Sequence, residues 1–272
     1  MWRLNKQKIG LIAGRGFLPF DVLSEIKMRG YNSVVVGLKG ESNSKLVESA
    51  DCFQEFALGQ LGAIIDFLAE SGVKEVVFAG KVGKEALFKE GFDDTFQSLL
   101  ASLPAKNDDA ILLALVNEFE RNNLIVVKQT DYLKHILAPS GIILGTEVTT
   151  EEWKDIQLGF KMAKAIGGLD IGQSIVVKKG VVLAVEAIEG TDQAIIRGGT
   201  LGGPGSVIVK VSKPQQDERF DVPTIGLTTI QSMQKVGAAI LAIETGKTLI
   251  TEKKALLDLA AKNAIKIIAC EL

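Results

Sequence analysis

The first half of the chain alternates short runs of β-branched residues with longer stretches whose apolar positions recur at helical spacing. Short apolar runs bounded by turn residues predict strands, and the amphipathic stretches predict helices. The predicted strands span residues 9–13, 33–36, 75–79 and 124–127, and the predicted helices span 19–29, 60–71 and 108–121. This alternation is typical of βαβ units built around a parallel sheet.

The pattern changes after Leu137, where residues 138–150 lack helical periodicity and carry turn residues. A change of this kind indicates a domain boundary. Beyond it we predict a hairpin within 174–186, strands at 207–211, 248–250 and 266–269, and helices at 153–166, 231–245 and 252–263. The expected fold is α/β with two domains, a parallel-sheet domain over 1–140 and a mixed α/β domain over 150–272.

The amino-acid composition limits the kinds of partner that the protein can bind. With 47% hydrophobic residues among 272, the chain can fill a substantial core. Lys and Arg number 31 against 33 Asp and Glu, so no overall field attracts nucleic acid, and an anion needs a local site. No apolar run approaches the roughly 20 residues of a membrane span, and the first residues lack a secretory signal pattern. We therefore expect a cytoplasmic protein.

Few residues suit metal or nucleophilic chemistry. His135 is the single histidine, which excludes a histidine-rich metal centre and a serine–histidine–aspartate triad. Cys52 and Cys270 are far apart in the sequence, and their apolar neighbours suggest buried, reduced thiols. The chemistry must therefore use carboxylates, lysine, arginine and backbone amides.

A glycine-rich turn containing Gly14, Gly16 and Pro19 joins the first predicted strand to the first helix. Its amides and the helix N-terminus could face a phosphate, although an ordinary tight turn explains the same residues. Pro19 stands where a dinucleotide fingerprint has its third glycine, and the second strand ends at Gly37 without the expected acid. A nicotinamide cofactor is therefore disfavoured.

Two further groups flank predicted elements in the first half. Gly80 and Lys81 follow the strand at 75–79, so Lys81 either contacts a phosphate or is a solvated loop residue. Asp108 and Asp109 open a helix, where one acid or Asn107 can cap it. The other acid is then available to a metal ion or a ribose.

The predicted hairpin is bordered by polar residues: Asp170 and Gln173 precede it, and Glu186, Glu189, Thr191 and Asp192 follow it, with Arg197 nearby. Surface charge is the simple explanation for each of them. A buried, uncompensated carboxylate at Glu186 would be costly, however, since this residue ends an apolar arm.

The segment from Lys210 to Gly226 is too rich in proline to be a helix, and Pro214 and Pro223 stiffen it. We interpret it as a preorganised polar site, with an exposed charged loop as the alternative. Lys210, Lys213 and Arg219 can face phosphate oxygens, while Asp217 or Asp221 can bind Mg²⁺ or orient a water.

Taken together and in order, seven motifs resemble the LpxI-type UDP-2,3-diacylglucosamine pyrophosphatases of lipid A synthesis. They are Ala13–Pro19, Gly59–Gly62, Ala79–Val82, Asn107–Leu112, Leu169–Gln173, Ala184–Asp192 and Lys210–Pro223. The resemblance covers nearly the whole chain, and the last two motifs are specific. Asn107 and Gln215 depart from it, since glycine is common at both positions.

The resemblance implies an N-terminal Rossmann-like domain that binds UDP and a C-terminal domain that hydrolyses the pyrophosphate with Mg²⁺ or another divalent cation. The implied products are UMP and 2,3-diacylglucosamine 1-phosphate. The essential aspartate of the family maps to Asp221, with Asp192 as a further metal ligand and Glu186 and Glu189 as neighbouring acids. We also expect a homodimer that meets the cytoplasmic face of the inner membrane through its lipid substrate.

Residues expected to bind substrate are Gly14, Gly16, Pro19, Gly80, Lys81, Asp108, Asp109, Asp170, Gln173 and Thr191. The remaining alternatives are a non-catalytic protein that binds a nucleotide sugar or lipid, and an NAD-dependent oxidoreductase.

Overall fold

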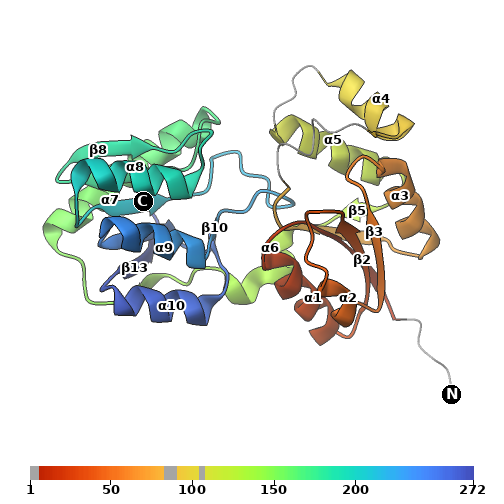
Figure 1. Ribbon diagram of the computed structural model, residues 1–272, viewed down its shortest axis with the longest axis horizontal. Helices are drawn as coiled ribbons and strands as arrows, with labels where there is room; N and C mark the ends of the chain where they lie inside the picture. The colour runs from red at the N-terminus through yellow and green to blue at the C-terminus, as the bar shows by residue number, and fades with distance from the viewer. Residues whose placement is uncertain (1–5, 83–90, 104–107) are drawn as a thin grey trace. The chain divides into compact units, whose positions relative to one another are not determined.

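The computed structural model describes residues 6–82, 91–103 and 108–272, which form two compact units (Figure 1). The first unit holds the described residues up to Leu133 together with Glu218–Phe220. The second holds Lys134–Asp217 and Asp221–Leu272. Two separate stretches of the chain therefore belong to the first unit. None of the helices in the described ranges is long and apolar enough to cross a membrane.

The first unit contains a parallel sheet with the strand order β3-β2-β1-β4-β5. Its strands are β1 (Lys8–Ala13), β2 (Asn32–Leu38), β3 (Cys52–Phe56), β4 (Glu75–Ala79) and β5 (Ile125–Val126). Val34 and Val36 face one core cluster and Val35 the opposite side, because successive strand residues alternate. The parallel sheet expected for the first half is confirmed.

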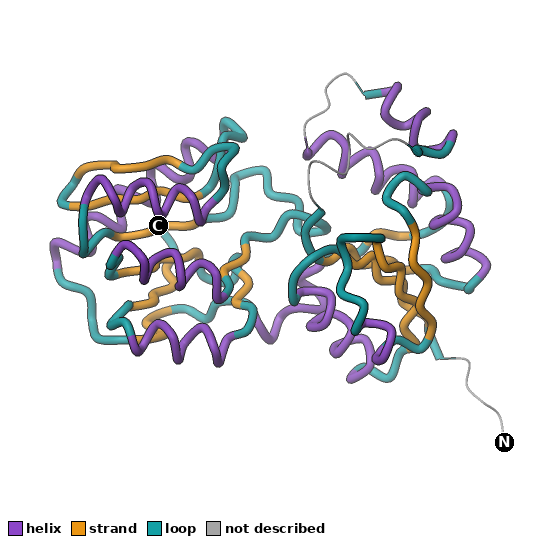
Figure 2. Tube along the Cα trace, viewed as in Figure 1, coloured by secondary structure: helices purple, strands orange, loops and turns teal. Residues whose placement is uncertain are grey.

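Helices cover this sheet (Figure 2). They are α1 (Leu18–Met28), α2 (Leu46–Ser49), α3 (Leu61–Glu70), α4 (Asp94–Ser102), α5 (Asp108–Arg121) and α6 (Gln129–Leu133). α1 begins with Pro19 in its first turn and buries Val22 and Ile26 at helical spacing. In α3, Ile64 and Leu68 enter the same core as Val36. The predicted helices 19–29, 60–71 and 108–121 are therefore found within one residue of their expected ends.

The second unit is built on a mixed sheet with the order β6-β13-β11-β9-β7-β8. Its strands are β6 (Gly141–Leu144), β7 (Ser174–Lys178), β8 (Val181–Val185), β9 (Val207–Lys210), β11 (Ile240–Glu244) and β13 (Lys266–Cys270). β11 pairs in parallel with β9 and β13, whereas β6, β7 and β8 join antiparallel. The predicted hairpin is the β7–β8 pair. A small parallel pair, β10 (Thr224–Ile225) and β12 (Leu249–Ile250), completes the strands described for this unit.

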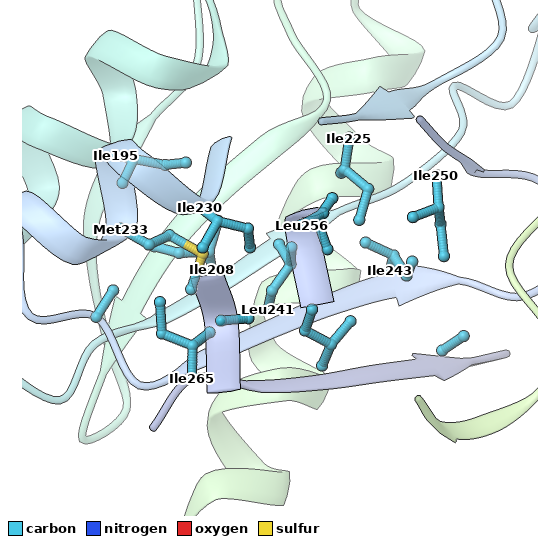
Figure 3. Packing of buried hydrophobic residues seen from close by; sticks show 14 of the residues in the cluster. Ile195, Ile208, Ile225, Ile230, Met233, Leu241, Ile243, Ile250, Leu256 and Ile265 are labelled. Atoms are coloured by element: carbon cyan, nitrogen blue, oxygen red, sulfur yellow. The ribbon is translucent and has the colours of Figure 1, made fainter. Parts of the chain in front are cut away.

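The helices of the second unit cover both faces of its sheet. They are the short 3₁₀ helix η2 (Lys134–Ile136), α7 (Thr150–Gly168), α8 (Thr191–Gly202), α9 (Leu227–Val236) and α10 (Lys253–Lys262). On β11, Ile240 and Ala242 pack with α7, while Leu241 and Ile243 join the cluster with Met233 of α9 (Figure 3). Both faces of β11 are therefore apolar, as is typical of a central strand covered on both sides.

The predicted helix over 231–245 is wrong. α9 ends at Val236, where Gly237 takes the left-handed conformation with φ of 66°, and Ile240–Glu244 is a strand. A continuous apolar run suits either a buried strand or a buried helix, so periodicity alone does not separate them. Glycine at this position is the usual stop of a helix.

Cys52 is exposed, so the expectation that it is buried is wrong. It opens β3, which is an edge strand of the first sheet, so that among the described strands of this sheet only β2 pairs with it. Cys270 is buried as expected, and burial raises the pKa of its thiol to about 11. Both thiols are free.

Candidate active site

Polar side chains gather where β9 ends and α8 begins. The ammonium of Lys210, the last residue of β9, donates to Thr191 Oγ1 at 3.0 Å, although the residue is only 7% exposed. Thr191 Oγ1 donates in turn to Glu186 Oε1 at 2.8 Å. The other oxygen of Glu186 accepts from the backbone N–H of Gln173 at 3.2 Å. The structure thus joins four predicted site residues, and the buried carboxylate of Glu186 is compensated by hydrogen bonds.

A second group surrounds Asp221. The ammonium of Lys213 lies 2.7 Å from Asp170 Oδ1 and 3.4 Å from Asp221 Oδ2. Gln216 Nε2 also donates to Asp221 Oδ2, and Gln216 Oε1 accepts from the backbone N–H of Lys213 at 2.8 Å. The backbone N–H of Asp221 donates to the carbonyl of Asp217 at 3.0 Å. The Asp221 carboxylate, with a side chain 34% exposed, is therefore held in place while it stays accessible.

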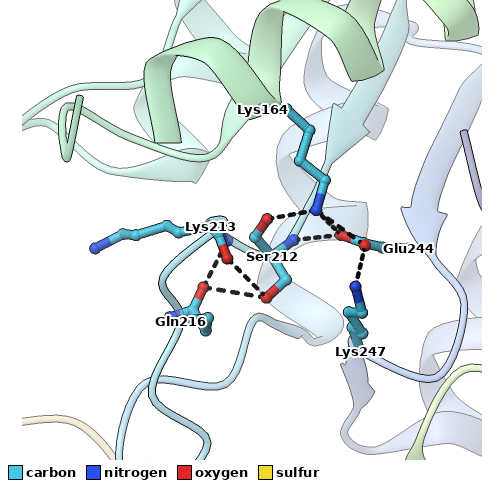
Figure 4. A network of polar contacts seen from close by, with 6 residues as sticks. All are labelled: Lys164, Ser212, Lys213, Gln216, Glu244 and Lys247. Atoms are coloured by element: carbon cyan, nitrogen blue, oxygen red, sulfur yellow. Dashed lines mark hydrogen bonds and ion pairs between the residues drawn. The ribbon is translucent and has the colours of Figure 1, made fainter. Parts of the chain in front are cut away.

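Sequence reasoning missed a third group, centred on Glu244 at the end of β11 (Figure 4). Its carboxylate accepts from Lys164 Nζ at 2.7 and 2.9 Å, from Lys247 Nζ at 2.9 Å and from the backbone N–H of Ser212 at 2.8 Å. Burial raises the pKa of Glu244, but the hydrogen bonds from Lys164, Lys247 and Ser212 together hold it below its ordinary value. The carboxylate is therefore ionised at neutral pH. Reading 231–245 as a helix concealed it; a strand ending in an acid was the available signal.

Three more of the predicted site residues are Glu189, Asp192 and Arg219. Glu189 pairs with Arg197, and this hydrogen bond lowers the pKa of the exposed Glu189 carboxyl. Asp192 lies in the first turn of α8, where the helix dipole favours an acid. Arg219, in the tripeptide that belongs to the first unit, lies 3.3 Å from Glu120 Oε1 of the same unit.

The glycine turn of the first unit has a packing role. Arg15 and Lys81 exchange backbone hydrogen bonds of 2.7 and 3.0 Å. A Cβ on Gly14 would lie 2.6 Å from the carbonyl oxygen of Lys81, and one on Gly80 would lie 2.7 Å from that of Arg15. Gly16 differs, since it has φ of 97° and open space around it. Gly14 and Gly80 are thus explained by close backbone approach, whereas Gly16 is explained by its conformation.

The same turn carries a cation that the sequence reasoning did not select. Arg15 Nε lies 2.6 Å from Glu41 Oε2, and the Glu41 side chain is only 4% exposed, whereas that of Arg15 is 54% exposed. Lys81 is exposed nearby. Asp108 and Asp109 open α5, but their side chains, like Asn107, fall outside the described residues.

Comparison with known proteins gives a match over almost the whole chain. Residues 8–136 match the LpxI N-terminal domain and residues 139–268 match the LpxI C-terminal domain. The UDP-2,3-diacylglucosamine pyrophosphatase LpxI of Caulobacter vibrioides is 32% identical over 266 residues, which cover 93% of this chain and 94% of that protein.

Solved structures resemble the chain only weakly. A UDP-glucose-4-epimerase from Stenotrophomonas maltophila aligns with a TM-score of 0.31 and 13% identity over 43% of this chain and 34% of its own. The nucleoside-diphosphate-sugar epimerase PA4631 from Pseudomonas aeruginosa aligns with a TM-score of 0.28 and 10% identity over 96% and 88% of the two chains. At these TM-scores the likeness carries no conclusion about fold or function.

Proposed function

Because the chain belongs to the LpxI family, we propose that it hydrolyses the pyrophosphate of UDP-2,3-diacylglucosamine, giving UMP and 2,3-diacylglucosamine 1-phosphate. The observation that carries this proposal is the match of both family domains, in order, together with the pyrophosphatase from Caulobacter vibrioides that shares 32% identity over 93% of the chain. The product is a precursor for lipid A, so the proposed role lies in lipid A synthesis.

The second unit offers side chains suited to this reaction. A pyrophosphate gains negative charge on its leaving oxygen, which cationic groups stabilise. Lys213 and Lys210 are fixed by acceptors, so they can present ammonium groups without a further loss of freedom. Asp221, held by Gln216 and Lys213, can orient the attacking water or hold a cation at the same oxygen. We assign the central role to Asp221 for this reason.

A divalent cation such as Mg²⁺ is part of the proposal. Among the described residues, no group of three or more His, Cys, Asp or Glu side chains is arranged to hold a metal. Mg²⁺ does not need one, because it commonly binds one or two carboxylates, with waters and substrate phosphates completing its shell. Asp221 fits that donor set, and Asp192 is the proposed second ligand. When bound, the cation would neutralise developing phosphate charge.

We assign UDP binding to the first unit, as a Rossmann-like domain. The strand order β3-β2-β1-β4-β5 is that of the first five strands of the doubly wound dinucleotide-binding fold, which supports this assignment. The turn with Gly16 and the first amides of α1 follow the carboxyl end of β1, where such folds bind phosphates. Lys81 follows β4 at the same sheet edge.

The proposal includes a cytoplasmic location, with peripheral contact to the inner membrane through the lipid substrate. Leu169 is 72% exposed, Ile171 48% and Ile188 84%, and each lies within four residues of Gln173 or Glu186 in the sequence. Exposed aliphatic side chains beside a polar site suit a substrate with acyl chains. Binding to vesicles that contain the substrate, compared with vesicles that lack it, tests the contact. The proposed homodimer is tested by light scattering.

The decisive experiment incubates the purified protein with UDP-2,3-diacylglucosamine and Mg²⁺ and follows UMP release. We expect turnover that is lost with a chelator and restored by added Mg²⁺. Tight substrate binding without UMP release would instead favour a non-catalytic binding protein. Saturable binding of a nicotinamide dinucleotide would favour an oxidoreductase.

A further inference from the structure

The buried acid at the end of β11 is tied to the loop that carries Asp221. Ser212 is held on both sides: its N–H donates to Glu244 Oε2 at 2.8 Å, and its carbonyl accepts from Lys164 Nζ at 2.8 Å. Lys164 also donates to both oxygens of Glu244. A closed ring of hydrogen bonds therefore joins Lys164 of α7, Ser212 in the segment after β9 and Glu244 at the end of β11 (Figure 4).

From Ser212 the restraint continues to Asp221. The next residue, Lys213, donates its N–H to Gln216 Oε1 at 2.8 Å, and Ser212 Oγ lies 3.5 Å from the same oxygen. Gln216 Nε2 then donates to Asp221. In Figure 4 the side chain of Lys213 points away from Glu244, and its ammonium meets Asp170 and Asp221 instead. A continuous set of hydrogen bonds thus runs from Glu244 to Asp221.

Stability alone is a weak reason for this arrangement. The Glu244 side chain is 6% exposed and that of Lys164 is 29% exposed, so both groups have given up much of their hydration. The attraction of such a pair barely offsets that loss, and apolar residues of similar volume often stabilise a protein as well. Directed hydrogen bonds differ from apolar packing because they fix the orientation of the backbone that they join.

We infer that Glu244 and Lys164 are positioning residues that orient the Lys213–Asp221 loop for the reaction. They touch neither substrate nor cation in this role. They hold the N–H and the carbonyl of Ser212, so that Gln216 and Lys213 keep the Asp221 carboxylate in one orientation. The inference rests on the proposed pyrophosphate hydrolysis. It adds Glu244 and Lys164, which are not among the predicted site residues, to the residues that this reaction requires.

The test compares Glu244→Gln with a matched control, Glu152→Gln. Glu152 also pairs with a lysine of the same unit, Lys266, at 2.8 and 3.0 Å, but it caps α7 at the end away from Lys164. We expect Glu244→Gln to lower kcat by about 10- to 100-fold with little change in KM, the range seen when residues that orient a catalytic group are lost. Glu152→Gln should keep the wild-type kcat.

A double-mutant cycle separates positioning from folding. If Glu244 acts through Asp221, then Glu244→Gln added to Asp221→Ala causes no further loss of the residual rate. A structural role alone would lower the melting temperature, leave kcat per folded molecule unchanged and give independent effects in the cycle. Either of those results overturns the inference. Amide exchange at Ser212 and Lys213 provides a readout without substrate, and we expect it to be faster in Glu244→Gln.

Should Glu244→Gln fail to fold, Lys164→Met replaces it, because Glu244 then keeps its bonds from Lys247 and Ser212. The same fall in kcat is expected, and an unchanged kcat refutes the inference. Failure of the proposed function is distinguishable, since it would appear as absence of UMP release by the wild-type protein. In that case no turnover could be measured, and faster amide exchange at Ser212 would show only that Glu244 holds this segment in place. The inference about catalysis would then be refuted together with the proposed function.

Discussion

The carboxylate of Asp221 is accessible and has a fixed orientation. Its side chain is 34% exposed and is held by Gln216 and Lys213. Glu189 is held as well, but by an exposed pair with Arg197, and exposed pairs contribute little. Glu186 is buried and uses its oxygens for Thr191 and Gln173. Among these acids, Asp221 is the one suited to meet a substrate.

We therefore predict that Asp221→Ala leaves a folded protein whose turnover is slowed by at least about 10²-fold, the scale of losing a group that stabilises charge or positions water. Steady-state UMP release measures the effect, and circular dichroism checks the fold. Near-normal turnover by a folded variant would remove Asp221 from the mechanism.

The charge of Glu244 predicts a pH dependence of stability. Its pKa in the folded protein lies below the ordinary 4.5, so folding favours the ionised form. The resulting stabilisation is complete above pH 4.5 and is lost as the pH falls through the lowered pKa. Denaturant unfolding should therefore show a gap between the wild type and Glu244→Gln that is widest near neutral pH and narrows in acid. A gap that widens on acidification would contradict this assignment.

At the scale of elements, α8 shows how packing can outweigh helix propensity. It contains Gly198 and Gly199, which are poor helix formers. A Cβ on Gly198 would lie 2.6 Å from the Cβ of Val176, and one on Gly199 would lie 2.3 Å from a methyl group of Val236. The glycines allow the helix to lie close to β7 and α9, and that close approach places Thr191 beside Lys210.

We predict that Gly198→Ala destabilises the protein by about 1–3 kcal/mol, because overpacking against Val176 exceeds the roughly 1 kcal/mol gained in helix propensity. The matched control is Gly168→Ala in the last turn of α7, where a Cβ would meet only Pro214 Cγ at 3.9 Å. That change should stabilise the protein by about 0.4–1 kcal/mol. Chemical denaturation measures both, and equal effects of the same sign would refute the packing argument.

At the scale of the whole molecule, the chain contributes a short segment of its second half to the first unit. Glu218 accepts a backbone hydrogen bond from Gln129 at 2.9 Å and pairs with Lys128 at 2.9 Å. Phe220 packs against the apolar core of that unit. Asp217 and Asp221, on either side, belong to the second unit. The segment that carries the predicted site residues therefore contributes residues to both units.

This arrangement predicts that Phe220→Ala destabilises the first unit, although the residue is distant from it in sequence. Loss of a partly buried phenyl ring should cost about 2 kcal/mol and speed amide exchange in β4. Phe17→Ala is the control, since Phe17 is in the same unit but 54% exposed, and its change should be small. Unchanged exchange in β4 for Phe220→Ala would show that the segment is not part of that unit.

The sequence by itself determined the βαβ alternation of the first half, the β7–β8 hairpin and the residues available for chemistry. These features depend on local periodicity and turn residues, which are visible in a window of a few residues. The sequence also shows that the chain has a single histidine, which excludes a histidine-rich metal centre and a serine–histidine–aspartate triad. It likewise shows Pro214 and Pro223 on either side of Asp221.

Tertiary structure alone decided that Ile240–Glu244 is a strand, that the glycines of α8 belong to a helix, and that Glu244 meets Lys164 and Ser212. An apolar run is buried equally well as a helix or a strand, so the neighbouring strands β9 and β13, which supply its hydrogen bonds, settle the matter. The partners of a buried charge are likewise set by contacts between distant segments. Local pattern therefore revealed which groups could act, and packing decided which of them meet.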